Sequence, residues 1–151
     1  MALQSQELIY YELDGFGDLK ELGRIELEAE VVCMDIGDIP EGRQRCKFMA
    51  VGLSNHKVRV FSLDLDSCLQ KISFLDLPSV SESVSLIEMS KDAATHFDTN
   101  YEQVLYLFVG MKNGVLLKAK LNQDTCNLSD IRTRVLGNRP VRYFFNPQFI
   151  F

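Results

Sequence analysis

The side chains that could bind metal or act as nucleophiles are few and widely separated in this sequence. The four cysteines share no CxxC spacing; they are Cys33, Cys46, Cys68 and Cys126. Only His56 and His96 could complete a zinc site, which normally uses closely spaced pairs of cysteine and histidine ligands. Cys33 lies within an apolar run, which favours a free thiol. The sequence therefore predicts no metal site and no cofactor.

Motifs of enzyme active sites are also missing. The chain contains no GxSxG, HExxH, GxxxxGK[ST] or GxGxxG motif. His56 lies in a predicted hairpin turn and His96 in a long polar stretch, and neither has an evident partner for acid–base catalysis. We predict no catalytic residue and a protein that is not an enzyme, with an independent small enzyme as an alternative.

Basic residues near the C-terminus are the candidate partner-binding residues. Residues 118–142 hold six bases and two acids, whereas residues 1–30 hold eight acids and two bases. Arg132 and Arg134 would share one face of a strand, and Arg139 and Arg142 could extend this stripe. A solvated outer strand, contact with an acidic protein and direct contact with RNA are the three interpretations. The net charge of −5 disfavours RNA, because neutralisation of phosphates supplies most of that affinity.

The elements that position these residues are β-strands. Apolar residues recur with a period of two, and the runs are separated by Gly, Asn, Asp, Ser and Pro, which is typical of strands joined by tight turns. No window predicts an amphipathic helix. Eleven strands are expected, at residues 7–13, 19–26, 31–36, 47–53, 57–64, 68–75, 83–89, 104–111, 114–121, 128–136 and 140–145.

An internal repeat indicates how these strands are organised. VGLSNHKVRVFSLD, beginning at Val51, aligns without gaps on VGMKNGVLLKAKLN, beginning at Val109, at an offset of 58 residues. Each copy lies within a run of four predicted strands. Four-stranded antiparallel units at a period of roughly 40 to 50 residues are typical of β-propeller blades.

We therefore predict an all-β fold, an incomplete β-propeller with about two four-stranded antiparallel blades and parts of the flanking blades. The expected boundaries are the end of a preceding blade at 1–30, blades at 31–82 and 83–137, and the first strand of a following blade with a divergent tail at 138–151. A β-sandwich is the alternative architecture. An open set of blades leaves faces uncovered, so self-association or low stability is expected in isolation.

Five stretches of the chain resemble a known family in the expected order. They are ELIYYELD, EAEVVCMDIGDIPEG, FMAVGLSNHKVRVFSLD, GMKNGVLLKAKL and NLSDIRTRVLGNRPVRYF. They resemble the middle of the large β-propeller subunit of splicing factor 3b. The family also includes the large subunits of the damage-specific DNA-binding protein and of the cleavage and polyadenylation specificity factor. The resemblance fades after Arg142, in YFFNPQFIF.

The resemblance implies a non-catalytic scaffold in pre-mRNA splicing, within the particle that recognises the branch site, and part of the second of three propellers. It implies other splicing factor 3b subunits and spliceosomal proteins as partners, proximity to RNA through the complex, and a nuclear location. No apolar run approaches the roughly 20 residues of a membrane helix, so no membrane is expected. The alternatives are an adaptor of a DNA-damage-type ubiquitin ligase or of a cleavage and polyadenylation complex.

Overall fold

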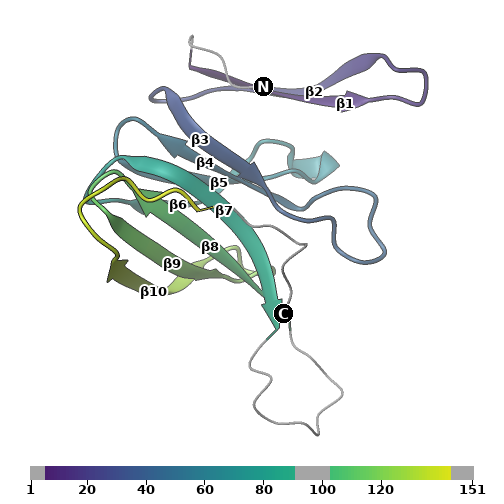
Figure 1. The fold of residues 1–151 in the computed structure, drawn as a ribbon. Helices are drawn as coiled ribbons and strands as arrows, with labels where there is room; N and C mark the ends of the chain where they lie inside the picture. The colour runs from purple at the N-terminus through teal and green to yellow at the C-terminus, as the bar shows by residue number, and fades with distance from the viewer. Residues whose placement is uncertain (1–5, 91–102, 144–151) are drawn as a thin grey trace, which may run out of the picture.

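The computed structural model describes residues 6–90 and 103–143, which form three antiparallel sheets stacked as layers (Figure 1). The first sheet pairs β1 (Glu7–Leu13) with β2 (Leu19–Glu26). The strands of the second sheet are, in order, β3 (Val31–Ile36), β4 (Phe48–Leu53), β5 (Lys57–Ser62) and β6 (Lys71–Asp76). The strands of the third sheet are, in chain order, β7 (Ser81–Ser90), β8 (Gln103–Met111), β9 (Val115–Leu121) and β10 (Leu128–Val135).

The second sheet is covered on both faces, because alternate residues of a strand point to opposite sides. Val51 and Phe61 lie in one apolar cluster with Leu8 of β1. Val60, next to Phe61 in the chain, lies in another cluster with Leu107 of β8. The second sheet is therefore the middle layer, and β1–β2 and β7–β10 lie on opposite sides of it (Figure 1).

The turn between β1 and β2 is closed by an aspartate, as its sequence Asp14-Gly15-Phe16-Gly17 suggests. Asp14 Oδ1 accepts hydrogen bonds from the backbone N–H groups of Phe16 and Asp18, each at 2.9 Å. Gly17 has a φ of +93°, which glycine adopts without strain. These backbone hydrogen bonds lower the pKa of the Asp14 carboxyl, and the bond from Asp18 has the largest effect.

Because of this lowered pKa, the contribution of Asp14 to the stability of the protein is expected to depend on pH. A carboxyl with a folded-state pKa below its unfolded value stabilises the protein fully above the unfolded value of about 3.9. The contribution is lost as the pH falls through the folded-state value. Asp14→Ala should therefore lower the Tm at pH 7 in scanning calorimetry, and the difference from the wild type should shrink in acid. A difference that persists unchanged at the lowest pH at which the chain folds contradicts this role.

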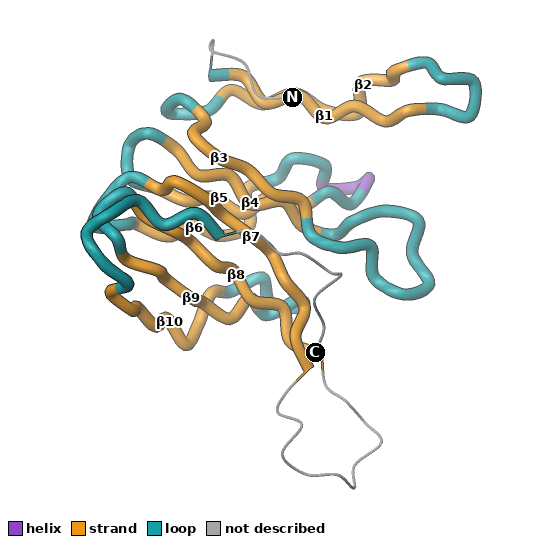
Figure 2. The backbone as a smooth tube through the Cα atoms, viewed as in Figure 1, coloured by secondary structure: helices purple, strands orange, loops and turns teal. Residues whose placement is uncertain are grey.

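Two strand boundaries differ from the predicted ones in the β5–β6 connection. The expected strands 57–64 and 68–75 leave residues 65–67 between them, and these residues form η1 (Leu65–Ser67), a single 3₁₀ turn and the one helical element among the described residues (Figure 2). The strands themselves end earlier and begin later than expected, at Ser62 and Lys71. Leu69 has a φ of +58°. The alternating pattern does not show where the two strands stop, because Leu63 and Leu69 are apolar although neither belongs to a strand.

The internal repeat occupies equivalent hairpins in two sheets. Residues 51–64 contain most of β4–β5 and residues 109–122 contain β9 and the end of β8. In each sheet the register of the preceding strand shifts beside the repeated glycine, Gly52 or Gly110. A Cβ at Gly52 would lie 2.6 Å from Cys33 Sγ, and one at Gly110 would lie 2.6 Å from Ser83 Oγ. Glycine is needed at both positions because the neighbouring strand approaches so closely.

The expected eleventh strand, 140–145, is not seen in the described part of the chain. Residues 140–143 have no strand assignment, and Phe144 and Phe145 lie outside the described residues. The backbone N–H of Val141 donates to the carbonyl of Met111 at 3.0 Å, so the segment is attached to the end of β8. It makes such isolated bonds in place of a regular ladder. Of the expected domain boundaries, 30 falls between β2 and β3, 82 falls one residue inside β7 and 137 follows β10, and the division into domains stays a prediction.

Candidate functional site

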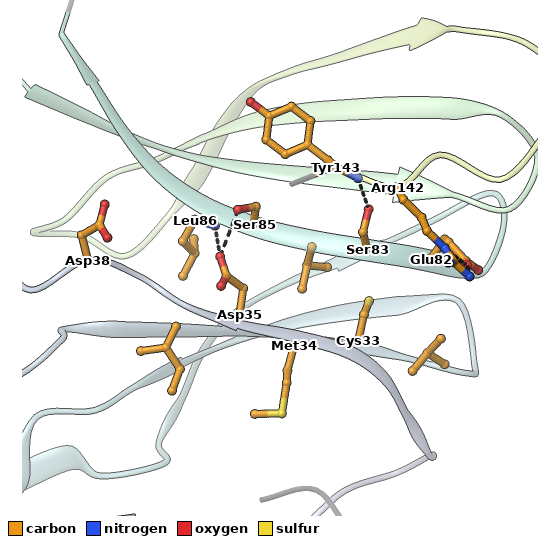
Figure 3. Close-up of a pocket in the computed structure, with 13 residues that line it drawn as sticks. Cys33, Met34, Asp35, Asp38, Glu82, Ser83, Ser85, Leu86, Arg142 and Tyr143 are labelled. Carbon is orange, nitrogen blue, oxygen red and sulfur yellow. Dashed lines mark hydrogen bonds and ion pairs between the residues drawn. The ribbon is translucent and has the colours of Figure 1, made fainter. Parts of the chain in front are cut away.

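A groove of about 710 Å³ runs between the second and third sheets. Its walls are β3, β7 and the segment after β10, and Figure 3 shows the side chains that line it. Three of them are carboxylates, Asp35, Asp38 and Glu82, and one is a guanidinium, Arg142. The groove therefore brings four charged groups together at the junction of the second and third sheets.

Asp35 connects the second sheet to the third. Its Oδ2 accepts a hydrogen bond from Ser85 Oγ at 3.0 Å and from the backbone N–H of Leu86 at 2.8 Å. Figure 3 shows Asp35 directed at these groups on β7, whereas Met34 points the other way. Leu86 is 3 % exposed, so its N–H needs a partner within the protein. The carboxylate supplies that partner across the junction.

Ser83 forms a second connection, between β7 and the segment that follows β10. Its Oγ donates to the carbonyl of Val141 at 3.1 Å and accepts from the backbone N–H of Tyr143 at 2.9 Å. The Tyr143 ring stacks on Phe108 with centroids 5.0 Å apart and planes 7° apart. The segment is thus held by both polar and aromatic contacts.

The reactive side chain nearest the middle of β3 in this groove is the Cys33 thiol. Burial raises the pKa of the Cys33 thiol, so it is protonated at neutral pH and is a poor nucleophile or metal ligand. Within residues 6–90 and 103–143, no group of three His, Cys, Asp or Glu side chains is arranged to hold a metal ion. All four cysteines are free thiols. The polar groups of the groove mainly bond to one another and fix the sheets.

Arg132 and Arg134 lie on β10, at the outer edge of the third sheet. Both are exposed, and Arg132 Nε donates to Asp130 Oδ1 at 2.8 Å. Asp130 has a φ of +47°, at a point where the pairing of β10 with β9 is irregular. This irregular edge displays Arg132 and Arg134 to solvent and discourages continuous pairing with another strand.

Arg142 does not extend the stripe as expected. Its Nε and Nη2 each lie 2.8 Å from Glu82 Oε1, at the edge strand β7 on the opposite side of the sheet (Figure 3). Arg139 is exposed in the connection between the two edges. The four candidate arginines therefore do not form one stripe, because Arg132 and Arg134 lie at one edge of the sheet, Arg142 lies at the other edge and Arg139 lies between them. Whether any of them contacts a partner stays a prediction.

Sequence reasoning missed Asp35 and the alternating serines of β7 as junction residues. The signal in the sequence is a lone carboxylate within the apolar run VVCMDI and the pattern SESVS at the start of β7. Both patterns are ambiguous, because an alternating polar residue in a strand usually faces water. His56 lies in the β4–β5 turn with a φ of +64°, as predicted for a turn residue, and His96 lies outside the described residues.

A family model described as the RSE1/DDB1/CPSF1 second beta-propeller matches residues 1–147. The chain belongs to this family. The expected all-β, incomplete propeller fold is confirmed, and the β-sandwich alternative is set aside. The two four-stranded sheets are the repeating units that the internal repeat predicted.

Relatives within the family are named as splicing factors. The chain is 42 % identical to splicing factor 3B subunit 3 of Drosophila melanogaster, across 95 % of this chain and 13 % of that protein. It is 44 % identical to splicing factor 3B subunit 3 of Danio rerio, across 95 % of this chain and 12 % of that protein. The expected resemblance to splicing factor 3b is thus confirmed, and the chain spans about an eighth of the length of these relatives.

A solved structure shares the fold at low sequence identity. BBS1N, crystallised with ARL6DN and soaked with lead, has a TM-score of 0.54 and 19 % identity, covering 93 % of this chain and 35 % of that one. This likeness concerns the fold alone. Among the described residues no helix is long and apolar enough to cross a membrane.

Proposed function

We propose that the chain acts as part of a non-catalytic interaction scaffold in pre-mRNA splicing. The observation that carries the proposal is its 42 % identity, over 95 % of its length, to splicing factor 3B subunit 3. The sheets would hold other splicing factor 3b subunits and spliceosomal proteins in register, within the particle that recognises the branch site. This activity places the chain in the nucleus, with RNA close by through the complex.

The junctions between the sheets support a scaffold role. A scaffold must keep its binding surfaces in a fixed relation. If the junctions were loose, binding would have to order these surfaces, and the loss of conformational entropy would weaken the affinity. Here Asp35 and Ser83 fix neighbouring units through hydrogen bonds of 2.8–3.1 Å. The exposed residues Arg132, Arg134 and Arg139 are the candidate contacts with partners, and Arg142 is a fourth, at the groove.

The proposal is tested by capture from nuclear extract. Immobilised wild-type chain should retain splicing factor 3b subunits, identified by mass spectrometry. A variant carrying Arg132→Glu and Arg134→Glu should retain several-fold less of them if these arginines contact the partners. Lys71→Glu with Lys112→Glu is the matched control, because it changes the net charge equally at exposed positions that are not part of β10.

Recovery of ubiquitin-ligase components, or of cleavage and polyadenylation factors, without splicing proteins would overturn the proposal. Equal loss in the arginine variant and the lysine control would show that net charge governs the capture. In that case the arginines are not the partner contacts.

A further inference from the structure

Three connections between strands lie at the same end of the first two sheets, and we call them the loop end; they are residues 14–18, 37–47 and 63–70 (Figure 2). The sheets of this fold stack face against face, so a further sheet covers a face and leaves the ends of the strands open. The exposure of the loop end therefore does not depend on how many sheets the stack contains.

Ion pairs tie the three connections of the loop end to one another. Arg45 Nε, in the β3–β4 connection, donates to Glu12 Oε1 of β1 at 3.0 Å. Arg43, in the same connection, pairs with Asp64 of the β5–β6 connection. The β1–β2 turn is itself closed by the hydrogen bonds of Asp14. A surface that is already ordered loses little conformational entropy on binding, which favours affinity.

Large apolar side chains are exposed on each of these connections. Phe16 is 97 % exposed at the tip of the β1–β2 turn, Ile39 is 55 % exposed in the β3–β4 connection, and Leu65 is 63 % exposed in η1. A single exposed apolar residue is common on protein surfaces and needs no explanation. Three of them on connections that contact one another are typical of a surface that binds another protein.

An open cleft of about 750 Å³ lies between the β3–β4 and β5–β6 connections. Its lining includes the exposed Leu65 and the buried Leu63, beside the polar side chains of Gln44 and Ser67. The side chains that contribute most to binding between proteins usually enter such hollows. The loop end therefore offers exposed apolar side chains together with a hollow that can receive one from a partner.

The loop end carries an excess of negative charge, because its three connections hold six acids and three bases. Arg43 and Arg45 are already paired with carboxylates, and Lys47 Nζ donates to the carbonyl of Gln123 at 2.6 Å. Five exposed carboxylates form no ion pair within residues 6–90 and 103–143; they are Asp14, Asp18, Asp38, Glu41 and Asp66. A partner with lysines or arginines would neutralise them.

We propose that the loop end docks a segment of a partner protein that combines large apolar side chains with lysines or arginines. The inference rests on the proposed scaffold function, and it adds a contact outside β10. The apolar side chains of the partner would pack on Phe16, Ile39 and Leu65, and its cations would lie near the unpaired carboxylates. The same carboxylates repel the phosphates of RNA, so the charge favours a protein.

Photo-crosslinking from the loop end tests the proposal. The full chain is prepared with p-benzoylphenylalanine in place of Phe16 or of Leu65, and in place of Lys112, an exposed residue of the β8–β9 turn, as the control. After irradiation in nuclear extract, mass spectrometry identifies the attached peptide. Phe16 and Leu65 positions should yield peptides of splicing proteins that carry large apolar residues and more Lys and Arg than Asp and Glu. The yield should exceed that from the Lys112 position about fivefold or more.

Charge reversal then tests the role of the carboxylates. Glu41→Lys with Asp66→Lys should lower the crosslink yield from the Phe16 position several-fold. Glu26→Lys with Glu30→Lys is the matched control, because it changes the net charge equally at exposed positions outside the loop end, and it should leave the yield unchanged. Circular dichroism checks folding. Glu41→Gln with Asp66→Asn replaces the reversal variant if that variant does not fold.

Several results would overturn the proposal. They are yields no higher than from the Lys112 position, attachment to an acidic peptide, to nucleic acid or to a second copy of the chain, and equal yields in the two charge variants. If the wild-type chain still retains splicing factor 3b subunits in these cases, the proposed function stands and only the loop end is excluded as their contact. If the wild-type chain retains no splicing protein, the proposed function fails and this inference fails with it.

Discussion

Gly110→Val is expected to lower the free energy of unfolding by about 3 kcal/mol, the upper part of the range for overpacked sites. A side chain at Gly110 would place its Cβ 2.6 Å from Ser83 Oγ and 2.9 Å from the carbonyl carbon of Val141. Neither neighbour is the free end of a flexible side chain, because Ser83 is bonded to Val141 and Tyr143. The substitution should therefore force the segment after β10 away from the sheet.

Two controls accompany Gly110→Val in urea unfolding followed by circular dichroism. Lys112→Ala, in the exposed turn that follows, should change the free energy of unfolding by less than about 0.5 kcal/mol. Gly15→Ala tests the loss of a glycine itself, since a Cβ at Gly15 meets nothing within 4 Å. Equal unfolding midpoints for Gly110→Val and Lys112→Ala would show that Val141 does not lie close enough to Gly110 to exclude a side chain there.

Asp35→Ala is expected to cost about 2 kcal/mol, within the range for hydrogen bonds to charged groups. The substitution removes the acceptor of Ser85 Oγ and of the Leu86 N–H at the junction of the second and third sheets. The larger part of the cost comes from Leu86, whose buried N–H loses its partner. Asp35→Asn should cost less, because its side-chain oxygen can still accept one bond.

Asp38→Ala is the matched control for Asp35→Ala. Asp38 lines the same groove and is exposed, so its removal should change the free energy of unfolding by less than about 0.5 kcal/mol. The measurement is urea unfolding at pH 7 and constant ionic strength. If the two alanine variants unfold at the same urea concentration, Asp35 does not hold the junction.

The strands and their grouping could be predicted from the sequence because they depend on local periodicity. The apolar run FMAVGL and the alternation in β9 both indicate strands, and the repeated hairpin gives the four-stranded unit. The ends of the two strands beside the 3₁₀ turn at Leu65–Ser67 could not be predicted, since the apolar residues Leu63 and Leu69 fit the pattern of a strand. The position of Arg142 could not be predicted either, because the turn after β10 carries it across the whole sheet.

The partners of buried polar groups depend on packing between sheets and lie beyond local patterns. Arg59 is 7 % exposed within an apolar strand, and it pairs with Glu28 and lies 5.0 Å from the centroid of the Phe74 ring. Its sequence neighbourhood, KVRVFS, indicates only a polar position in a strand. The partner becomes evident once the first and second sheets are placed together.

The two junctions described above use different chemistry at similar places. One matches a carboxylate on β3 to a hydroxyl and an N–H on β7, and the other matches a hydroxyl on β7 to the carbonyl and N–H of the next segment. A duplicated unit inserted in the wrong order would leave donors or acceptors unmatched at its seam. The order of the sheets is therefore fixed by the hydrogen-bonding groups at their junctions. Two sheets of the same shape could not exchange places without loss of stability.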